Sequence, residues 1–264
     1  MRLIITIAVQ AMLISQLAYS QSDGSINISS SIVAQFIVTD PLGRRTGVDP
    51  RGGSNPLGGV RIKQIPGASY ATETPGDDPN DTTGIIPDDD VLFVFVYFIK
   101  ASENDGVYKI ETIGTEKGIY TINIRVVPFP GSIIQPYSVR VSGIIDSMQS
   151  NVYEIDYHSA RGTPIGFRKL VSNGTLRQDI LVSFAENWLG DRSFYEDLNQ
   201  RLDLFESLLS QRDSDRARNV LQGLQIKLDA ASQQSSGTSF ITHDAYQILS
   251  GDVATLLNQF PPQP

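Results

Sequence analysis

The hydrophobic pattern of this 264-residue chain changes its period once, and that change limits what the chain can fold into. From about residue 31 to residue 184, apolar and polar residues alternate in short runs separated by Gly, Pro, Asn and Asp. Residues 118–127 (GIYTINIRVV) show the alternation most clearly. After residue 190, apolar residues recur every three or four positions. A period of two is typical of half-buried β-strands, and a period near 3.6 is typical of amphipathic helices.

The alternating part of the chain predicts an antiparallel β-sandwich of seven or eight short strands. The expected strands are residues 32–39, 91–99, 106–113, 118–127, 137–145, 152–158, 165–171 and 176–184. Residues 91–99 (VLFVFVYFI) are apolar throughout, and their β-branched and aromatic content favours a buried strand over a buried helix. We also expect a short hairpin near 59–70 and a mobile loop at about 73–90, because a long unpatterned segment is uncommon inside a domain.

The last part of the chain predicts a small three-helix bundle. Ser193 and Glu196 have the spacing of a capping box at the start of its first helix. Three apolar stripes follow with helical spacing, and each marks one buried helix face. Their residues are Phe194, Leu198, Leu202, Phe205 and Leu209, then Ala217, Val220, Leu221, Leu224, Leu228 and Ala231, then Ala245, Ile248, Leu249, Val253, Leu256, Leu257 and Phe260. The predicted fold class is therefore α+β in sequence-separated domains, with the sandwich at 21–188 and the bundle at 189–260.

The first twenty residues have the features of a secretory signal peptide. A basic start at Arg2 precedes an apolar run over residues 3–17, and the small residues Ala18 and Ser20 precede a cleavage point after Ser20. An uncleaved membrane anchor is the alternative, but this apolar run is short for a span of about 20 residues. We expect a secreted, extracellular chain whose mature part does not insert into a membrane.

Composition excludes several functional classes. The chain contains no Cys, so thiol nucleophiles, Cys-based zinc sites and disulfide frameworks are ruled out. The formal net charge of −8, without any Lys/Arg cluster, disfavours nucleic acid as a partner. The two His residues, His158 and His243, offer little for histidine-based metal sites. Neither belongs to a Gly-x-Ser-x-Gly or His-Glu-x-x-His motif, so we expect no catalytic role for them.

Several turn and packing signatures resemble those of a known family. The segment 38–50 (VTDPLGRRTGVDP), followed by 65–70 (IPGASY), 118–122 and 141–146, resembles a β-sandwich module of large secreted bacterial proteins, often found beside von Willebrand factor A-type domains. The segment 198–257 is similar to the helical FIMAH domain that follows that module. The resemblance implies an extracellular accessory or surface module of a bacterium. It carries no catalytic motif, so no functional residue can be transferred.

One acidic cluster is the strongest candidate for a metal site. Its carboxylates are Asp77, Asp78, Asp81, Asp88, Asp89 and Asp90. The cluster lacks the spacing of an EF-hand loop, and a solvated loop that guards the next apolar strand against edge pairing explains it well. The alternative is a calcium site, because Ca²⁺ takes about six to eight oxygen ligands. No other cofactor is expected.

A second loop offers two more carboxylates. Asp40 and Asp49 both precede Pro, where a short carboxylate commonly bonds nearby amides and stabilises a turn. The alternative is that both help to hold Ca²⁺. We favour the turn.

The functional prediction is a secreted, non-catalytic module for surface adhesion or assembly. Its partner would be a surface protein or a polysaccharide that the sequence does not identify. Two alternatives stay open: a secreted hydrolase that uses the acidic-loop carboxylates, and a structural subunit of a surface layer. The aromatic residues of 93–98 are expected in the core rather than on a sugar-stacking surface, and the helical stripes are expected to pack against each other and the sandwich rather than against a partner.

Overall fold

The computed structural model describes residues 24–31, 33–52, 59–73, 91–97, 105–127, 135–158, 166–234 and 236–261, with the backbone alone in 71–73 and 91–97. The strands are β1 (Ser25–Ser30), β2 (Ala34–Thr39), β3 (Arg45–Asp49), β4 (Val60–Lys63), β5 (Ser69–Glu73), β6 (Val91–Tyr97), β7 (Gly106–Gly114), β8 (Gly118–Val127), β9 (Tyr137–Ile145), β10 (Ser150–Tyr157) and β11 (Gly166–Leu170). The helices are α2 (Asn173–Ala185), α3 (Arg192–Ser210), α4 (Ser214–Ser232) and α5 (His243–Gln259).

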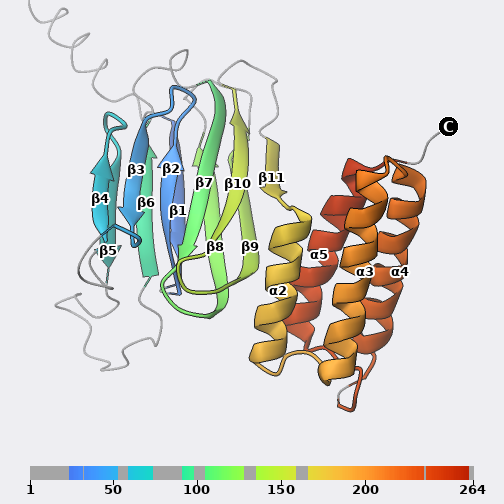
Figure 1. The fold of residues 1–264 in the computed structure, drawn as a ribbon. Coiled ribbons are helices and arrows are strands. Elements are labelled where there is room, and N and C mark those ends of the chain that lie inside the picture. Colours follow the sequence, from blue (N-terminus) through green and yellow to red (C-terminus); the bar gives the residue numbers. More distant parts are fainter. Residues whose placement is uncertain are drawn as a thin grey trace, which may run out of the picture.

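The strands form two antiparallel sheets (Figure 1). Sheet A has the order β5-β6-β1-β8-β9, and sheet B has the order β11-β10-β7-β2-β3-β4. The alternating sequences explain which side chains each sheet buries. In β8, the apolar residues Tyr120, Ile122, Ile124 and Val126 are all fully buried, while the polar residues between them are not. The α+β class and the antiparallel strands are as the sequence predicts.

The two sheets face each other across one apolar core. A single cluster of buried residues combines Ile26 and Ile122 of sheet A with Phe36, Ile110 and Ile155 of sheet B. Because neighbouring side chains of a strand point to opposite faces, one row of each strand fills this core and the other row forms the outer face of the sheet. The arrangement is sandwich-like.

The connection between β4 and β5 corrects the hairpin that the sequence predicts near 59–70. The two strands do not pair with each other, since β4 pairs with β3 in sheet B and β5 pairs with β6 in sheet A. Ile65 and Ala68, in the turn between them, are buried in the core shared by the sheets. The chain crosses from sheet B to sheet A at this turn, and the burial of Ile65 and Ala68 fixes the turn on the shared core.

The predicted strand at 176–184 is wrong, because this segment is the helix α2. Its apolar run Ile-Leu-Val suggests a strand, but the capping box upstream starts a helix: Thr175 N donates to Ser172 Oγ at 3.1 Å, and Ser172 N donates to Thr175 Oγ1 at 2.8 Å. Leu176 and Ile180, one helical turn apart, are then fully buried. The described residues therefore contain four helices, not three, and the helices begin upstream of the boundary predicted at 188/189.

The capping box predicted at the start of α3 is also wrong. The cap of α3 is Asp191, whose Oδ1 accepts a hydrogen bond from Phe194 N at 3.0 Å. Ser193 lies inside the helix and donates to Asp191 Oδ1 at 2.7 Å, and Glu196 forms an ion pair with Arg192. Asp at the cap position competes with Ser for the same free amides, so the sequence spacing alone misplaces the helix start by two residues.

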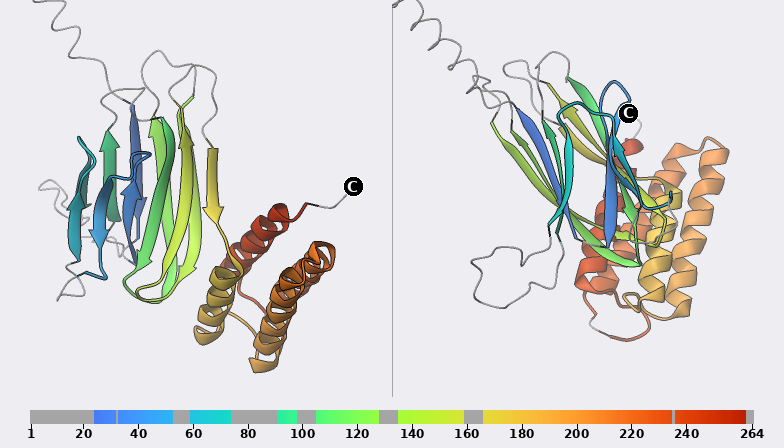
Figure 2. Two further views of the ribbon diagram at one scale, coloured as in Figure 1. Left: turned by 45° about the horizontal axis from the view of Figure 1, so that its top comes forward. Right: turned by 90° about the vertical axis from the view of Figure 1, so that its left-hand side faces the viewer.

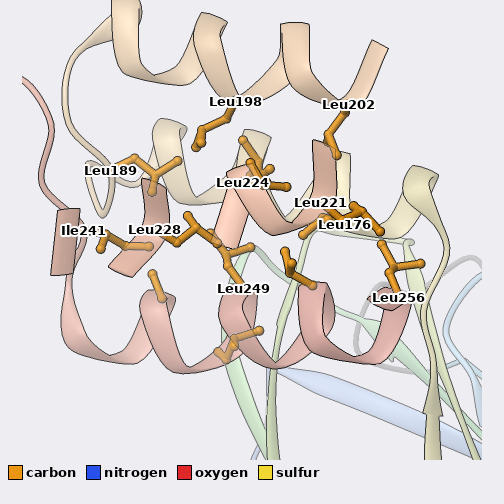
Figure 3. Packing of buried hydrophobic residues seen from close by; sticks show 14 of the residues in the cluster. Leu176, Leu189, Leu198, Leu202, Leu221, Leu224, Leu228, Ile241, Leu249 and Leu256 are labelled. Carbon is orange, nitrogen blue, oxygen red and sulfur yellow. The ribbon is translucent and has the colours of Figure 1, made fainter. Parts of the chain in front are cut away.

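The apolar stripes of the helices are confirmed as the centre of a second core (Figure 3). Leu198 and Leu202 of α3, Leu221 and Leu224 of α4, and Leu249 of α5 point toward one another there, and all are fully buried. Sheet residues join this cluster, since Ile144 of β9 belongs to it and Ile119 of β8 packs against it. The four helices thus lie beside the β9 and β11 edges of the sheets (Figure 2).

Within the part of the chain that the structure describes, no helix is both long and apolar enough to cross a bilayer.

Substitutions at two glycines with positive φ, one closely packed and one in open space, test the packing of β2 on β3. Gly47 has φ +145°, and a Cβ added there would lie 2.2 Å from the backbone oxygen of Phe36. Gly43 has φ +79°, but an added Cβ would meet nothing within 4 Å. We expect Gly47→Ala to lower the free energy of unfolding by about 3 kcal/mol or more, and Gly43→Ala by about 1 kcal/mol, in denaturant titrations. Equal losses would contradict this packing.

A second pair of variants tests the helical core within one helix. Leu224 of α4 is fully buried, whereas Ile226 of the same helix is 68% exposed. Leu224→Ala should cost about 2–5 kcal/mol of stability, because it removes buried methyl groups and leaves a cavity. Ile226→Ala is the matched control and should change stability by less than about 0.5 kcal/mol. A small effect at Leu224 would show that the helices do not form this core.

Candidate functional site at the junction of sheets and helices

The residues predicted for calcium lie outside the described part of the chain. These are Asp77, Asp78, Asp81, Asp88, Asp89 and Asp90. The calcium site therefore stays a prediction. Among the described residues, no group of three or more His, Asp or Glu is placed to hold a metal ion.

The turn interpretation of Asp40 and Asp49 is confirmed. Asp40 Oδ1 accepts hydrogen bonds from Leu42 N at 3.0 Å and from Arg44 N at 2.8 Å, and its Oδ2 pairs with Arg44 Nε at 2.6 Å. Asp49 holds Arg51 in the same way, through both the backbone and the guanidinium. The Arg51 hydrogen bond is the largest cause that lowers the pKa of Asp49. Both carboxylates thus stabilise their own loops.

The two histidines lie in separate places at the surface. His158 Nε2 is 2.8 Å from Asp156 Oδ1, and both side chains are partly exposed. His243 is exposed in the first turn of α5. Within the described residues, neither has a hydrogen bond to a Ser or Thr hydroxyl, so the arrangement lacks the nucleophile–base contact that a hydrolytic triad requires.

A buried charged cluster, which the sequence reasoning missed, lies where β11 meets the helices. We call Lys169, Asp179 and Asp252 the junction cluster. Lys169 Nζ donates to both carboxylate oxygens of Asp252 at 2.7 Å each, and it lies 3.7 Å from Asp179 Oδ2. The two aspartates are each only 3% exposed. The cluster therefore connects β11 with both α2 and α5.

Polar side chains of both sheets extend the cluster into the sheet core. Tyr120 of β8 and Tyr153 of β10 share a hydrogen bond of 2.5 Å between their hydroxyls. Thr112 Oγ1 donates to Asn151 O at 3.1 Å and lies 3.3 Å from the Tyr120 hydroxyl. Burial raises the pKa of both tyrosines, and Lys169 acts on Tyr120 in the opposite direction. Both hydroxyls therefore stay protonated and serve as hydrogen-bonding groups.

The charges of the junction cluster balance only if one carboxyl holds a proton. Burial is the main cause that raises the pKa of Asp179 well above its usual range, and the negative charge of Asp252 adds to it. Burial alone would lower the pKa of Lys169, but the carboxylates of Asp252 and Asp179 outweigh it, and that pKa is raised. The raised pKa favours a proton on Asp179, beside the ion pair of Lys169 with Asp252. A buried carboxylate without a cationic partner would cost far more free energy than a neutral, protonated carboxyl.

A pocket of about 390 Å³ opens beside the cluster, between the β9–β10 turn and the first turns of α2. Asp179 contributes to its wall, together with Asn151 and Thr175, but Lys169 and Asp252 do not. The lysine has no free electron pair while its ammonium is held by Asp252, so it is not available as a base or a nucleophile. Chemically, the arrangement is suited to joining three elements.

One signal in the sequence could have found this cluster. Asp179 and Asp252 occupy buried helix positions next to Ile180 and Val253, where an apolar residue is expected. Lys169 lies two residues after Phe167, on the same inward face of β11. A charged residue at a core position implies a buried partner of opposite charge, although the sequence does not say which one.

No family model, curated protein or solved structure matches this chain.

The protonated state of Asp179 predicts how stability depends on pH. Because its pKa is higher in the folded chain than the unfolded value near 3.8, the folded state keeps a proton that the unfolded state releases. The contribution of Asp179 to stability should therefore fall as pH rises above about 4, by up to about 1.4 kcal/mol per pH unit, until the folded pKa is reached. In Asp179→Asn the side chain is a neutral amide throughout this pH range, so it takes up no proton on folding. The stability of this variant relative to the native chain should rise between pH 4.5 and pH 7.5 in denaturant titrations.

Asp203→Asn is the control for this experiment, since Asp203 of α3 is 67% exposed. Its stability relative to the native chain should not change with pH over the same interval. If Asp179→Asn behaves like this control, Asp179 is ionised in the folded chain and the proposed charge balance is wrong.

Proposed function

We propose that this chain is a secreted, non-catalytic surface module that acts in adhesion or assembly. The observation behind the proposal is that the buried charges of Lys169 and Asp252 at the junction bind each other. Lys169 gives two hydrogen bonds to Asp252, and these join β11 to α5. A catalytic lysine or aspartate needs a free proton-accepting group that faces a substrate. Lys169 and Asp252 are occupied in holding the helices on the sheets.

Two further contacts support a rigid unit of sheets and helices. Gln259 Nε2 at the end of α5 donates to Val171 O, just after β11, at 3.1 Å. Lys117, in the β7–β8 turn, lies 3.7 Å from Glu186 at the end of α2. A rigid unit of this kind presents its outer surfaces in fixed positions, which lowers the entropic cost of binding a partner.

Export and family membership belong to the same proposal. The features of residues 1–20 support a signal peptide cleaved after Ser20, which would deliver the chain to the cell exterior. Two facing sheets followed by helices are consistent with the resemblance to the secreted bacterial β-sandwich module and its FIMAH-like helical domain. We therefore propose that the chain is a β-sandwich domain followed by a helical domain.

The proposal can be tested with the purified chain on cell envelopes and on a panel of polysaccharides. We expect saturable binding to at least one of them, without release of soluble fragments from the bound material. Asp179→Asn should bind equally well, because its carboxyl group has a structural role. Release of soluble fragments by the native chain would contradict a non-catalytic module, and so would the absence of binding to every surface tested.

A further inference from the structure

One outer face of the sheets differs from the rest of this acidic chain. We call it the polar face; it is formed by alternate residues of the adjacent strands β1, β8 and β9. These residues are Asn27, Ser29, Thr121, Asn123, Arg125, Ser138, Arg140 and Ser142. The residues between them point into the core, as the fully buried Ile122 and Ile124 do. Asn123, Arg125, Ser138, Arg140 and Ser142 are exposed, so nothing in the described residues covers them.

The polar face contains no acidic residue. The sequences of β1, β8 and β9 are SINISS, GIYTINIRVV and YSVRVSGII, without a single Asp or Glu. The outer face of sheet B is different, because Glu111 and Glu154 lie there and form ion pairs with Arg51 and Arg168. In a chain with 29 acidic and 21 basic residues, the polar face is therefore locally positive.

Arg125 and Arg140 supply the positive charge of this face. Arg140 is paired with Asn123 across the strands, and Arg125 follows two residues later, so the arginines are diagonal neighbours. Diagonal neighbours on an antiparallel pair are about 7–8 Å apart. Neither arginine forms an ion pair with any other described residue, whereas Arg44, Arg51, Arg168 and most of the other described cations do.

Hydroxyl and amide groups surround the two arginines. Thr121 Oγ1 and Ser142 Oγ are 3.0 Å apart, and Asn123 Nδ2 donates to Ser29 Oγ at 3.5 Å. Each of these hydroxyls can still donate or accept a further hydrogen bond. The result is an array of small polar groups around two guanidinium groups.

We propose that the polar face binds a polysaccharide that carries carboxylate groups, which would identify the partner of the surface module proposed above and rests on that function. A guanidinium group matches a carboxylate with two parallel hydrogen bonds. Ser, Thr and Asn side chains match the hydroxyl groups of sugar rings. The net charge of −8 repels such a polymer from the molecule as a whole, which favours binding at a face whose strands carry no Asp or Glu.

The test is a binding titration of the purified chain with polygalacturonate, with neutral dextran as the uncharged polymer. We expect Arg125→Ala combined with Arg140→Ala to weaken binding about a hundredfold, because each lost guanidinium–carboxylate pair at an exposed surface corresponds to about a tenfold change. The matched control combines Arg61→Ala with Lys63→Ala on the edge strand β4, which are exposed and without a described ion pair. The control removes the same net charge and should change binding by less than about threefold.

A neutral variant tests the array of hydrogen-bonding groups separately from charge. Asn123→Ala should weaken binding to polygalacturonate severalfold without any change in net charge. Equal weakening by the two double variants would overturn the proposal, since it would indicate general electrostatic attraction. Equally strong binding to dextran, or binding that does not depend on Arg125 and Arg140, would overturn this face as the binding site while leaving the adhesion function intact. Binding to envelope protein but to no polysaccharide would also overturn the inference and not the function.

Discussion

The ion pair between Lys169 and Asp252 joins strand β11 to helix α5 inside the molecule. Lys169 lies on the edge strand β11, with its side chain on the core side of sheet B. Its ammonium is only tolerable there because α5 brings Asp252 to within 2.7 Å. The helices in turn bury part of their apolar surface on Ile144 of β9. Sheets and helices therefore depend on each other for both charge compensation and apolar burial.

Asp179, the third member of the junction cluster, lies beside this ion pair and has a raised pKa. With Asp179 and Asp252 both charged, one lysine would leave a net negative charge in a buried place, which is unfavourable at low dielectric. A proton on Asp179 removes that charge, and burial is the reason why this carboxyl keeps it. The hydroxyls of Tyr120 and Tyr153 continue the polar contacts into the sheet core, so the junction is polar at its centre and apolar around it.

The outer faces of the two sheets differ in how their charges are paired, although both faces arise from the same alternation of side chains along a strand. On sheet B, carboxylates such as Glu154 and cations such as Arg168 compensate each other within the chain. On the outer rows of β1, β8 and β9, the residues paired with Arg125 and Arg140 carry hydroxyl and amide groups. A self-compensated surface has little to offer a charged partner, whereas an uncompensated one gains most from a partner of opposite charge.

The sequence by itself determined the class of each segment wherever one period dominates. It predicted the strand at 118–127, the stripes of α3 to α5 and the turn at Asp40, because these depend on neighbours within a few residues. Only the tertiary structure decided that β4 and β5 belong to different sheets and that Lys169 meets Asp252, whereas the helix at 176–184 follows the local cap at Ser172. These contacts join residues far apart in the chain, and the local pattern carries no record of which partner will neutralise a charge or cover an edge.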